Sequence, residues 1–183
     1  MPAKITPLSN GACVVLVVGS TFHDQLAPVA VPTAPTRQPA VIRRDPGETR
    51  ATLAEYKKRM PFRLQLPTIL ERSSYLDTCC GDTPARAYAL GGRPTVRLAY
   101  KTGTNEYWGI QETDWLGAPA LLDKSLTQWV NGRRYDLYYS GGDLHMVVLR
   151  TGGASYWVVN TLLNSLSNET MLAIARGFRP MTS

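Results

Sequence analysis

The sequence predicts an α+β domain in which an antiparallel meander of strands is covered by a helix near the C-terminus. Three turn signals support the meander: Asn131-Gly132, Gly141-Gly142 and Gly152-Gly153 each separate segments rich in aromatic and β-branched residues. A final segment has apolar residues at helical spacing, and a sheet with one apolar face needs such a cover. The chained hairpins and the covering helix together define the predicted fold class.

Two features precede this domain. Residues 12–18, Ala-Cys-Val-Val-Leu-Val-Val, are continuously apolar and predict an isolated N-terminal strand that is buried on both faces. Because the sequence before them offers no partner strands, we assign residues 1–26 to the remnant of a preceding small domain. Residues 27–46 are rich in proline and predict an extended, semi-rigid linker. Residues 47–183 remain for the α+β domain.

The positive charge of the chain is local. Twenty Lys and Arg against 14 Asp and Glu give a net charge of +6, of which residues 37–63 carry +5. Such a stretch suits an anionic polymer or an anionic surface, and the alternative is a solvated helix face. The candidate electrostatic residues are Arg43, Arg44, Arg50, Lys57, Lys58 and Arg59.

A short helix is expected after the linker. Asp45 suits the N-cap, Pro46 suits the first helical position, and Glu48 completes a capping box. Its sparse apolar stripe consists of Leu53, Tyr56 and Met60. Proline at the next position ends the helix.

Strands are expected through most of the remaining chain. Residues 62–66 alternate in polarity, and residues 96–100 and 107–111 flank the turn signal Gly103-Thr104-Asn105, which predicts a hairpin. The later turn signals predict strands at residues 128–130, 134–139, 144–149 and 155–160.

The covering helix is expected to begin after Ser167, a suitable N-cap, with Glu169 in its first turn. Arg176 suits the last turn and Gly177 the C-terminal cap. Met171, Ile174, Ala175 and Phe178 form its apolar stripe.

The sequence contains no common catalytic or nucleotide-binding motif. Cys13, Cys79 and Cys80 lack the spacing of a zinc site, so neither a metal nor a cofactor is predicted. A lone histidine on a strand, as His145 is here, is more often a packed or edge residue than a general base. A hydrolase that uses His145 is the corresponding alternative.

Aromatic residues are concentrated in the second half of the chain. Adjacent residues of a strand point to opposite faces, so one ring of a pair such as Tyr107-Trp108 is left for the outer face of the sheet. Exposed rings suit stacking on sugars, whereas the alternative is a sheet packed on both faces. The candidate polymer-binding residues are Tyr107, Trp108, Trp115, Trp129, Tyr139 and Trp157. Nucleic acid is not a predicted partner, because the basic stretch lacks interleaved aromatics.

Several segments of the chain, taken in order, carry a resemblance to a known protein family. They are residues 14–26, 60–68, 86–88, 106–115, 132–141 and 156–171, of which Trp-Val-Val-Asn-Thr-Leu-Leu at 157–163 and Leu-Ser-Asn-Glu-Thr-Met at 166–171 are the most specific. Together they resemble the C-terminal extracytoplasmic region of LytR-CpsA-Psr (LCP) family proteins of Gram-positive bacteria. The resemblance covers nearly all of the chain after residue 13.

In that family, a membrane-anchored catalytic domain outside the cell transfers lipid-linked glycopolymers to peptidoglycan. The resemblance implies that residues 12–26 are the last strand of a LytR C-terminal domain, and that the chain acts in the cell envelope. The implied partners are an anionic envelope polymer or an LCP-type protein, with membrane contact only through a partner or a missing anchor. No family catalytic residue has a counterpart here, so a non-catalytic accessory domain is expected. The alternative is a purely structural module that packs against a missing upstream domain.

Overall fold

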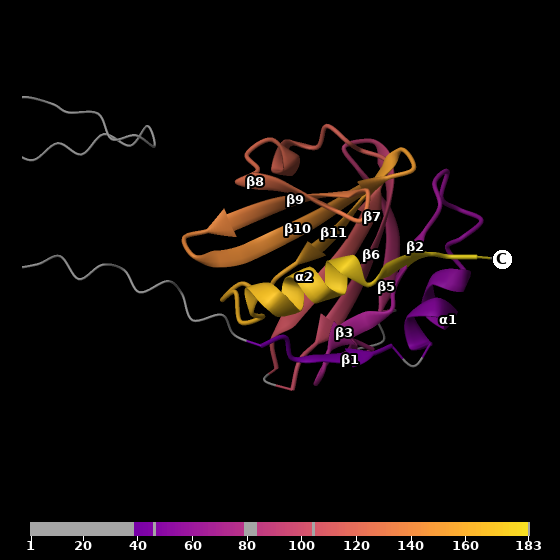
Figure 1. Ribbon diagram of the computed structural model, residues 1–183. Coiled ribbons are helices and arrows are strands. Elements are labelled where there is room, and N and C mark those ends of the chain that lie inside the picture. Colours follow the sequence, from indigo (N-terminus) through magenta and orange to yellow (C-terminus); the bar gives the residue numbers. More distant parts are fainter. Residues whose placement is uncertain (1–38, 46, 79–83, 104, 183) are drawn as a thin grey trace, which may run out of the picture. The chain divides into compact units, whose positions relative to one another are not determined.

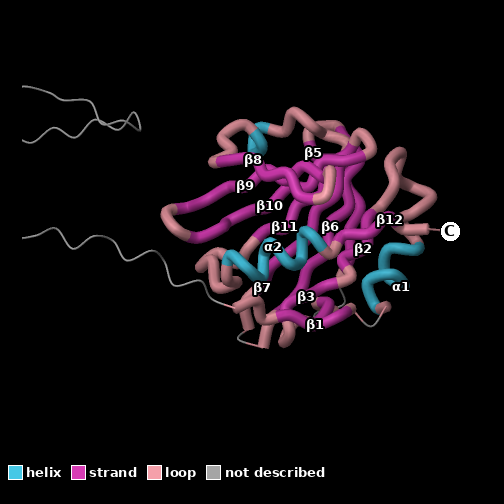
Figure 2. Tube along the Cα trace, viewed as in Figure 1, coloured by secondary structure: helices cyan, strands magenta, loops and turns pink. Residues whose placement is uncertain are grey.

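An antiparallel sheet of eight strands forms the centre of the computed structural model (Figure 1). The structure describes residues 39–45, 47–78, 84–103 and 105–182. The strand expected at residues 12–18, most of the expected linker, and Cys13, Cys79 and Cys80 lie outside the described residues. Strands are the predominant regular secondary structure of the described chain, as Figure 2 shows.

The strands of this sheet are β4 (Tyr75–Leu76), β5 (Ala85–Leu90), β6 (Arg93–Lys101), β7 (Tyr107–Thr113), β8 (Leu126–Val130), β9 (Arg133–Ser140), β10 (Asp143–Thr151) and β11 (Ala154–Val159). Their order in space is β4-β6-β7-β11-β10-β9-β8, with β5 also paired to β6. Two meanders, β5–β7 and β8–β11, therefore meet where β7 pairs with β11, in a register that places Gly109 opposite Val159.

The predicted hairpins are confirmed. Strands β6 and β7, which flank residues 102–106, pair with each other, and β8 and β9 pair around Asn131-Gly132. Asn131 and Gly132 both have positive φ, 50° and 71°, which is the requirement of the tight turn that favours Asn-Gly. Strand β8 does not follow β7 in space, because residues 114–125, including the short helix η2 (Pro119–Leu121), carry the chain to the opposite edge of the sheet.

Helix α2 (Asn168–Arg176) covers one face of the sheet, which we call the inner face (Figure 1). The Ser167 side chain caps the helix by accepting a hydrogen bond from the Thr170 amide at 3.2 Å, as expected. Met171, Ile174 and Ala175 are buried against the sheet, and Phe178 follows in the same core. The expected antiparallel sheet with a covering C-terminal helix is therefore confirmed.

Two small sheets complete the cover of the inner face. Strand β1 (Ile42–Arg44) pairs with β3 (Ile69–Glu71), and β2 (Gln65–Pro67) pairs with β12 (Phe178–Pro180). The strand expected at residues 62–66 is therefore shorter and begins later. Strands β1, β3, β4, β5 and β12 were not predicted.

Helix α1 (Glu48–Ala54) is shorter than the helix expected up to residue 60. The predicted N-cap at Asp45 is wrong: Gly47 occupies that position with φ of 105° and, as a glycine, supplies no side-chain cap. Asp45 follows directly on β1 and donates its amide hydrogen to the Thr68 carbonyl at 3.1 Å. Leu53 and Tyr56 are buried as expected. No helix within the described ranges is long and apolar enough to span a membrane.

Candidate functional site

The outer face of the sheet, opposite α2, has a covered half and an open half. Residues 114–125 cross the covered half, where Ala118 and Leu121 pack on Tyr138, Met146 and Trp157. The open half lies over β5, β6 and β7. On these strands successive side chains point to alternate faces: on β6, Val96, Leu98 and Tyr100 belong to the inner core, whereas Arg97 and Ala99 point outward and line the open half.

The covered half is fixed by a buried carboxylate. Asp136 accepts hydrogen bonds from Thr127 Oγ1 at 2.7 Å, from Arg134 Nε at 3.0 Å and from Arg150 Nε at 2.6 Å. Burial acts to raise the pKa of Asp136, but the hydrogen bonds from these three residues outweigh it and hold the pKa below its usual value. Arg150 also donates to the Leu116 carbonyl at 2.9 Å, which ties the crossing segment to the sheet.

A groove of about 830 Å³ occupies the open half. Three arginines line it, Arg59 after α1, Arg86 on β5 and Arg97 on β6, together with Tyr88 and Tyr107. We call it the arginine groove. Asp77 is the sole acid among its described lining residues, so the groove is positively charged.

Two of these arginines face each other across neighbouring strands. Arg86 and Arg97 are register partners in the β5–β6 ladder, and directly opposite like charges destabilise a sheet. Arg97 is exposed and forms no ion pair with any residue that the structure describes. It lies beside Tyr88, whose pKa is raised by burial while the Arg97 charge acts to lower it. The Tyr88 hydroxyl donates to Gln111 Oε1 at 2.9 Å, so that this ring is held in place beside Arg97.

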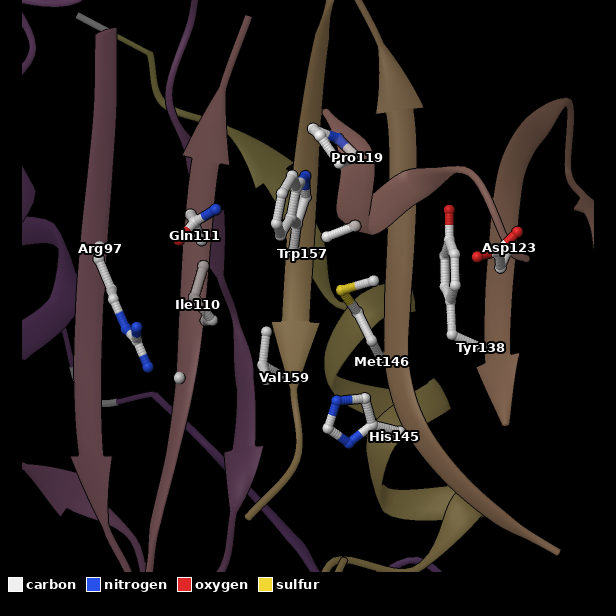
Figure 3. A pocket seen from close by; sticks show the side chains of 12 residues that line it. Arg97, Ile110, Gln111, Pro119, Asp123, Tyr138, His145, Met146, Trp157 and Val159 are labelled. Carbon is white, nitrogen blue, oxygen red and sulfur yellow. The ribbon is translucent and has the colours of Figure 1, made fainter. Parts of the chain in front are cut away.

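Arg97 also lines a second cavity, of about 380 Å³, between the two halves of the outer face (Figure 3). A Cβ atom on Gly109 would lie 3.6 Å from Arg97 Nε and 3.0 Å from the Leu98 carbonyl oxygen. Because residue 109 is a glycine, the Arg97 guanidinium has room to lie across β7. Figure 3 shows the Arg97 side chain directed toward β7, with Val159 between it and His145.

His145 lies at a bulge of β10, between Leu144 and Met146, and its ring is exposed. Its Nδ1 is 3.3 Å from Asn164 Oδ1. Within the described part of the chain, no carboxylate or nucleophilic hydroxyl is hydrogen-bonded to this imidazole, so the arrangement of a general base is not assembled around it.

The six predicted polymer-binding residues do not gather at one place. Only Tyr107 lies in the arginine groove, where it is 47% exposed with Lys101 Nζ 5.7 Å from its ring centre. Trp108 is buried on the inner face, stacked on Tyr100 at a centroid distance of 4.3 Å. Trp157 is buried, with Nε1 donating to Ser155 Oγ at 2.8 Å, although its side chain lines the second cavity.

The other three lie elsewhere. Trp115 is half-buried and covers the turn at Gly91, where a Cβ atom would lie only 2.3 Å from the indole. Trp129 is exposed on β8, at the edge of the sheet away from the arginine groove. Tyr139 is half-buried and packs against the inner core.

The six predicted electrostatic residues are also dispersed. Arg59 lines the arginine groove, with its guanidinium carbon 5.3 Å from the centre of the Tyr56 ring. Arg43 belongs to β1 and donates to the carbonyl oxygens of Arg44 and Ser74. Arg44, Arg50, Lys57 and Lys58 are exposed and do not line the groove.

Sequence reasoning missed Arg86, Tyr88 and Arg97. A partial signal was present for Arg97, because it alternates with apolar residues in the predicted strand at 96–100 and so had to point outward. Its position opposite Arg86 depends on β5, whose alternating small residues do not resemble a buried strand.

The carboxyl group with the most strongly shifted pKa lies outside the arginine groove, on the inner face. Glu112 of β7 is buried, and its Oε2 accepts a hydrogen bond from the Gln65 amide at 2.9 Å. Its Oε1 has no hydrogen-bond partner among the described residues. Burial raises the pKa of Glu112 to about 8, although the Gln65 hydrogen bond acts to lower it. Because the group is enclosed in the core, it bears on stability and not on ligand binding.

Comparisons of the chain with protein-family models, with curated proteins and with solved structures give no match. Among the described residues, no group of three or more His, Cys, Asp or Glu side chains is placed to hold a metal ion. The chemistry that the described site offers is therefore that of its arginines and tyrosines: charge, bidentate hydrogen bonds and ring surfaces.

Proposed function

We propose that this domain is a non-catalytic accessory module of the cell envelope that binds an anionic, sugar-containing polymer along the arginine groove. The cross-strand pair of Arg86 and Arg97 is the observation that carries the proposal. Arg97 has no ion-pair partner among the described residues, and an anion bound to its guanidinium on this face would also lie close to Arg86. Guanidinium groups also bind phosphate and carboxylate oxygens through two parallel hydrogen bonds.

The rings of the groove support a sugar-containing ligand. Tyr88 and Tyr107 are 38% and 47% exposed and lie on the same side of the sheet as Arg97. Amphipathic aromatic rings can pack on sugar rings and hydrogen-bond through their hydroxyl groups. Arg97 lines both the arginine groove and the second cavity, so the two lie next to each other on the outer face, within reach of one extended polymer segment.

The polymer class and the location come from the resemblance to LCP-type proteins, whose reaction attaches anionic glycopolymers to peptidoglycan. That resemblance supports an extracytoplasmic site of action. A domain of this kind would hold the polymer close to an LCP-type catalytic partner.

Binding can be measured by isothermal titration calorimetry with poly(glycerol phosphate) teichoic acid and with a neutral polysaccharide of similar length. We expect the teichoic acid to bind and Arg97→Gln to weaken that binding roughly tenfold, which is the loss of one charge-assisted hydrogen bond. Arg72→Gln is the matched control, because it removes the same charge from an exposed residue that does not line the groove. The affinity of this control should stay within about twofold of the wild type, as expected for a distant, screened charge.

Two results would contradict the proposal. Absence of binding by the wild type at low salt, where charge attraction is least screened, would favour the structural module without a ligand. Equal losses for Arg97→Gln and Arg72→Gln would show that the attraction depends on net charge and not on the groove. Tyr107→Ala separates ring stacking from charge, since it should weaken binding without changing the salt dependence.

A further inference from the structure

Strand β8 is an open edge of the main sheet. It stands at the end of the strand order and pairs with β9 alone. Beyond that ladder, the backbone of Leu126–Val130 makes no hydrogen bond to any residue of the described ranges. An edge strand leaves a row of backbone donors and acceptors free to pair with another strand.

This edge lacks the features that normally prevent such pairing. The strand Leu-Thr-Gln-Trp-Val carries no charge and no proline, and its register with β9 is unbroken. It also exposes apolar surface, because Leu126 is 41% exposed and Trp129 is 68% exposed. Large exposed apolar side chains beside an open ladder mark a site of association.

The opposite edge of the same sheet is protected. Strand β4 has only two residues, and β5 carries Arg86 on its outer face. The Tyr56 hydroxyl donates to the Ala85 carbonyl at 2.7 Å and so occupies an acceptor of β5. The contrast between the edges points to β8 as the one at which a second strand is accommodated.

We propose that β8 pairs with β8 of a second copy of this chain, antiparallel and about a two-fold axis at Gln128. That register aligns all five residues of the strand. It places Leu126 opposite Val130 of the partner subunit, on the inner face, and Thr127 opposite Trp129 of the partner subunit, on the outer face. Side chains from the same face therefore meet, which is the condition for a continuous sheet.

A second copy fits this edge because the strand is self-complementary. In a two-fold antiparallel pair only the central residue faces its own copy, so a charge at position 128 would be repelled across the axis, and Gln128 is neutral. β8 has no charge to oppose, and each apolar end meets the other. The ladder is short, so we expect a reversible, concentration-dependent dimer, as is typical of small interfaces.

The dimer leaves the arginine grooves free. The groove lies over β5–β7 and β8 forms the other edge, so the two grooves lie at the far ends of the joined sheet. The dimer is therefore independent of the proposed polymer binding, and each can fail without the other.

Sedimentation velocity over a concentration series tests the dimer. The wild type should shift from monomer to dimer as its concentration rises. Gln128→Lys and Gln128→Glu each place like charges across the two-fold axis and should remain monomeric, whereas their equimolar mixture should restore a dimer with one copy of each. Ser140→Lys and Ser140→Glu add the same charges to an exposed position of β9 and should dimerise as the wild type does.

Amide hydrogen exchange of the wild type gives a second readout that needs no variant. Protection of amides in Leu126–Val130 should increase with protein concentration. A wild type that stays monomeric at every concentration would overturn the proposal, and so would single Gln128 variants that dimerise normally. If the amides of this strand that are not bonded to β9 are protected equally at all concentrations, the edge is covered within one chain, which also overturns the proposal.

Discussion

The buried carboxyl group of Glu112 makes the stability of this domain depend on pH in an unusual direction. Its pKa is about 8 in the folded protein and 4.5 is the ordinary value, which applies to the unfolded chain. Between these pH values the folded protein retains a proton that the unfolded chain has released. The stabilising contribution of Glu112 to the folded state is therefore fully present below about pH 4.5 and is lost as the pH rises through about 8.

The size of the effect follows from the separation of the two pKa values. At about 1.4 kcal/mol per pH unit, the gap corresponds to a loss on the order of 5 kcal/mol between acid and alkaline conditions. The free energy of unfolding of a typical domain is about 5–15 kcal/mol, so this loss is a large part of it. A neutral glutamine at this position has nearly the same shape as the protonated acid and cannot ionise.

The appropriate assay is urea denaturation of the wild type and of Glu112→Gln at pH values from roughly 5 to 9. Over this range the difference between the folded and unfolded pKa of Glu112 makes stability depend on pH. We expect the two proteins to have similar free energies of unfolding at the acid end, and the variant to be increasingly the more stable one as the pH rises. Glu55→Gln, at an exposed position, should follow the wild type throughout. Parallel pH profiles for the wild type and Glu112→Gln would show that the carboxyl group is already ionised in the folded protein, and would refute this reasoning.

Three further perturbations test the packing. Ser167→Ala removes the side-chain cap of α2 and should lower the free energy of unfolding by about 1 kcal/mol in denaturant titrations, whereas Ser167→Asp should retain most of it. Ile174→Asp places a charge where the side chain is fully buried and should abolish cooperative thermal unfolding; an unchanged melting temperature would disprove the docking of α2, and Arg176→Asp is the exposed control. Asp136→Asn should lower the free energy of unfolding by about 3 kcal/mol at neutral pH, as the loss of one partner from a buried ion pair typically does. Because the pKa of Asp136 is lowered, its contribution is present above the ordinary value of 3.8 and lost as the pH falls, so the difference between the two proteins should narrow in acid.

Local turn and cap chemistry explains why much of the fold was predictable. Asn131-Gly132 favours its turn through two positive φ angles, and Ser167 caps α2 with its own side chain. Both signals act within a few residues. Asp45 had the same kind of signal, but it follows directly on β1 and donates its amide hydrogen to the Thr68 carbonyl, so a pairing distant in sequence fixes its backbone and the helix begins later.

The site was less predictable because it depends on which strands become neighbours. Alternation assigns Arg97 to the outer face, but only the β5–β6 register brings Arg86 opposite it. The aromatic candidates show the same limit. The rule that adjacent rings point to opposite faces holds for Tyr107 and Trp108, yet it does not say which ring is exposed, and Tyr138 and Trp157 on the outer face are covered by Ala118 and Leu121 of the crossing segment.

The pairing of β12 with β2 has a consequence for biosynthesis. Thr68 donates both its amide and its hydroxyl hydrogen to the Gly177 carbonyl, across a separation of 109 residues. During translation, β2 leaves the ribosome long before its partner strand has been made. The cover of the inner face cannot close until residues 178–180 emerge, and until then the apolar residues of the sheet stay exposed. We therefore expect the domain to reach its native packing only after nearly all of it has been synthesised, and to need protection from aggregation until that point.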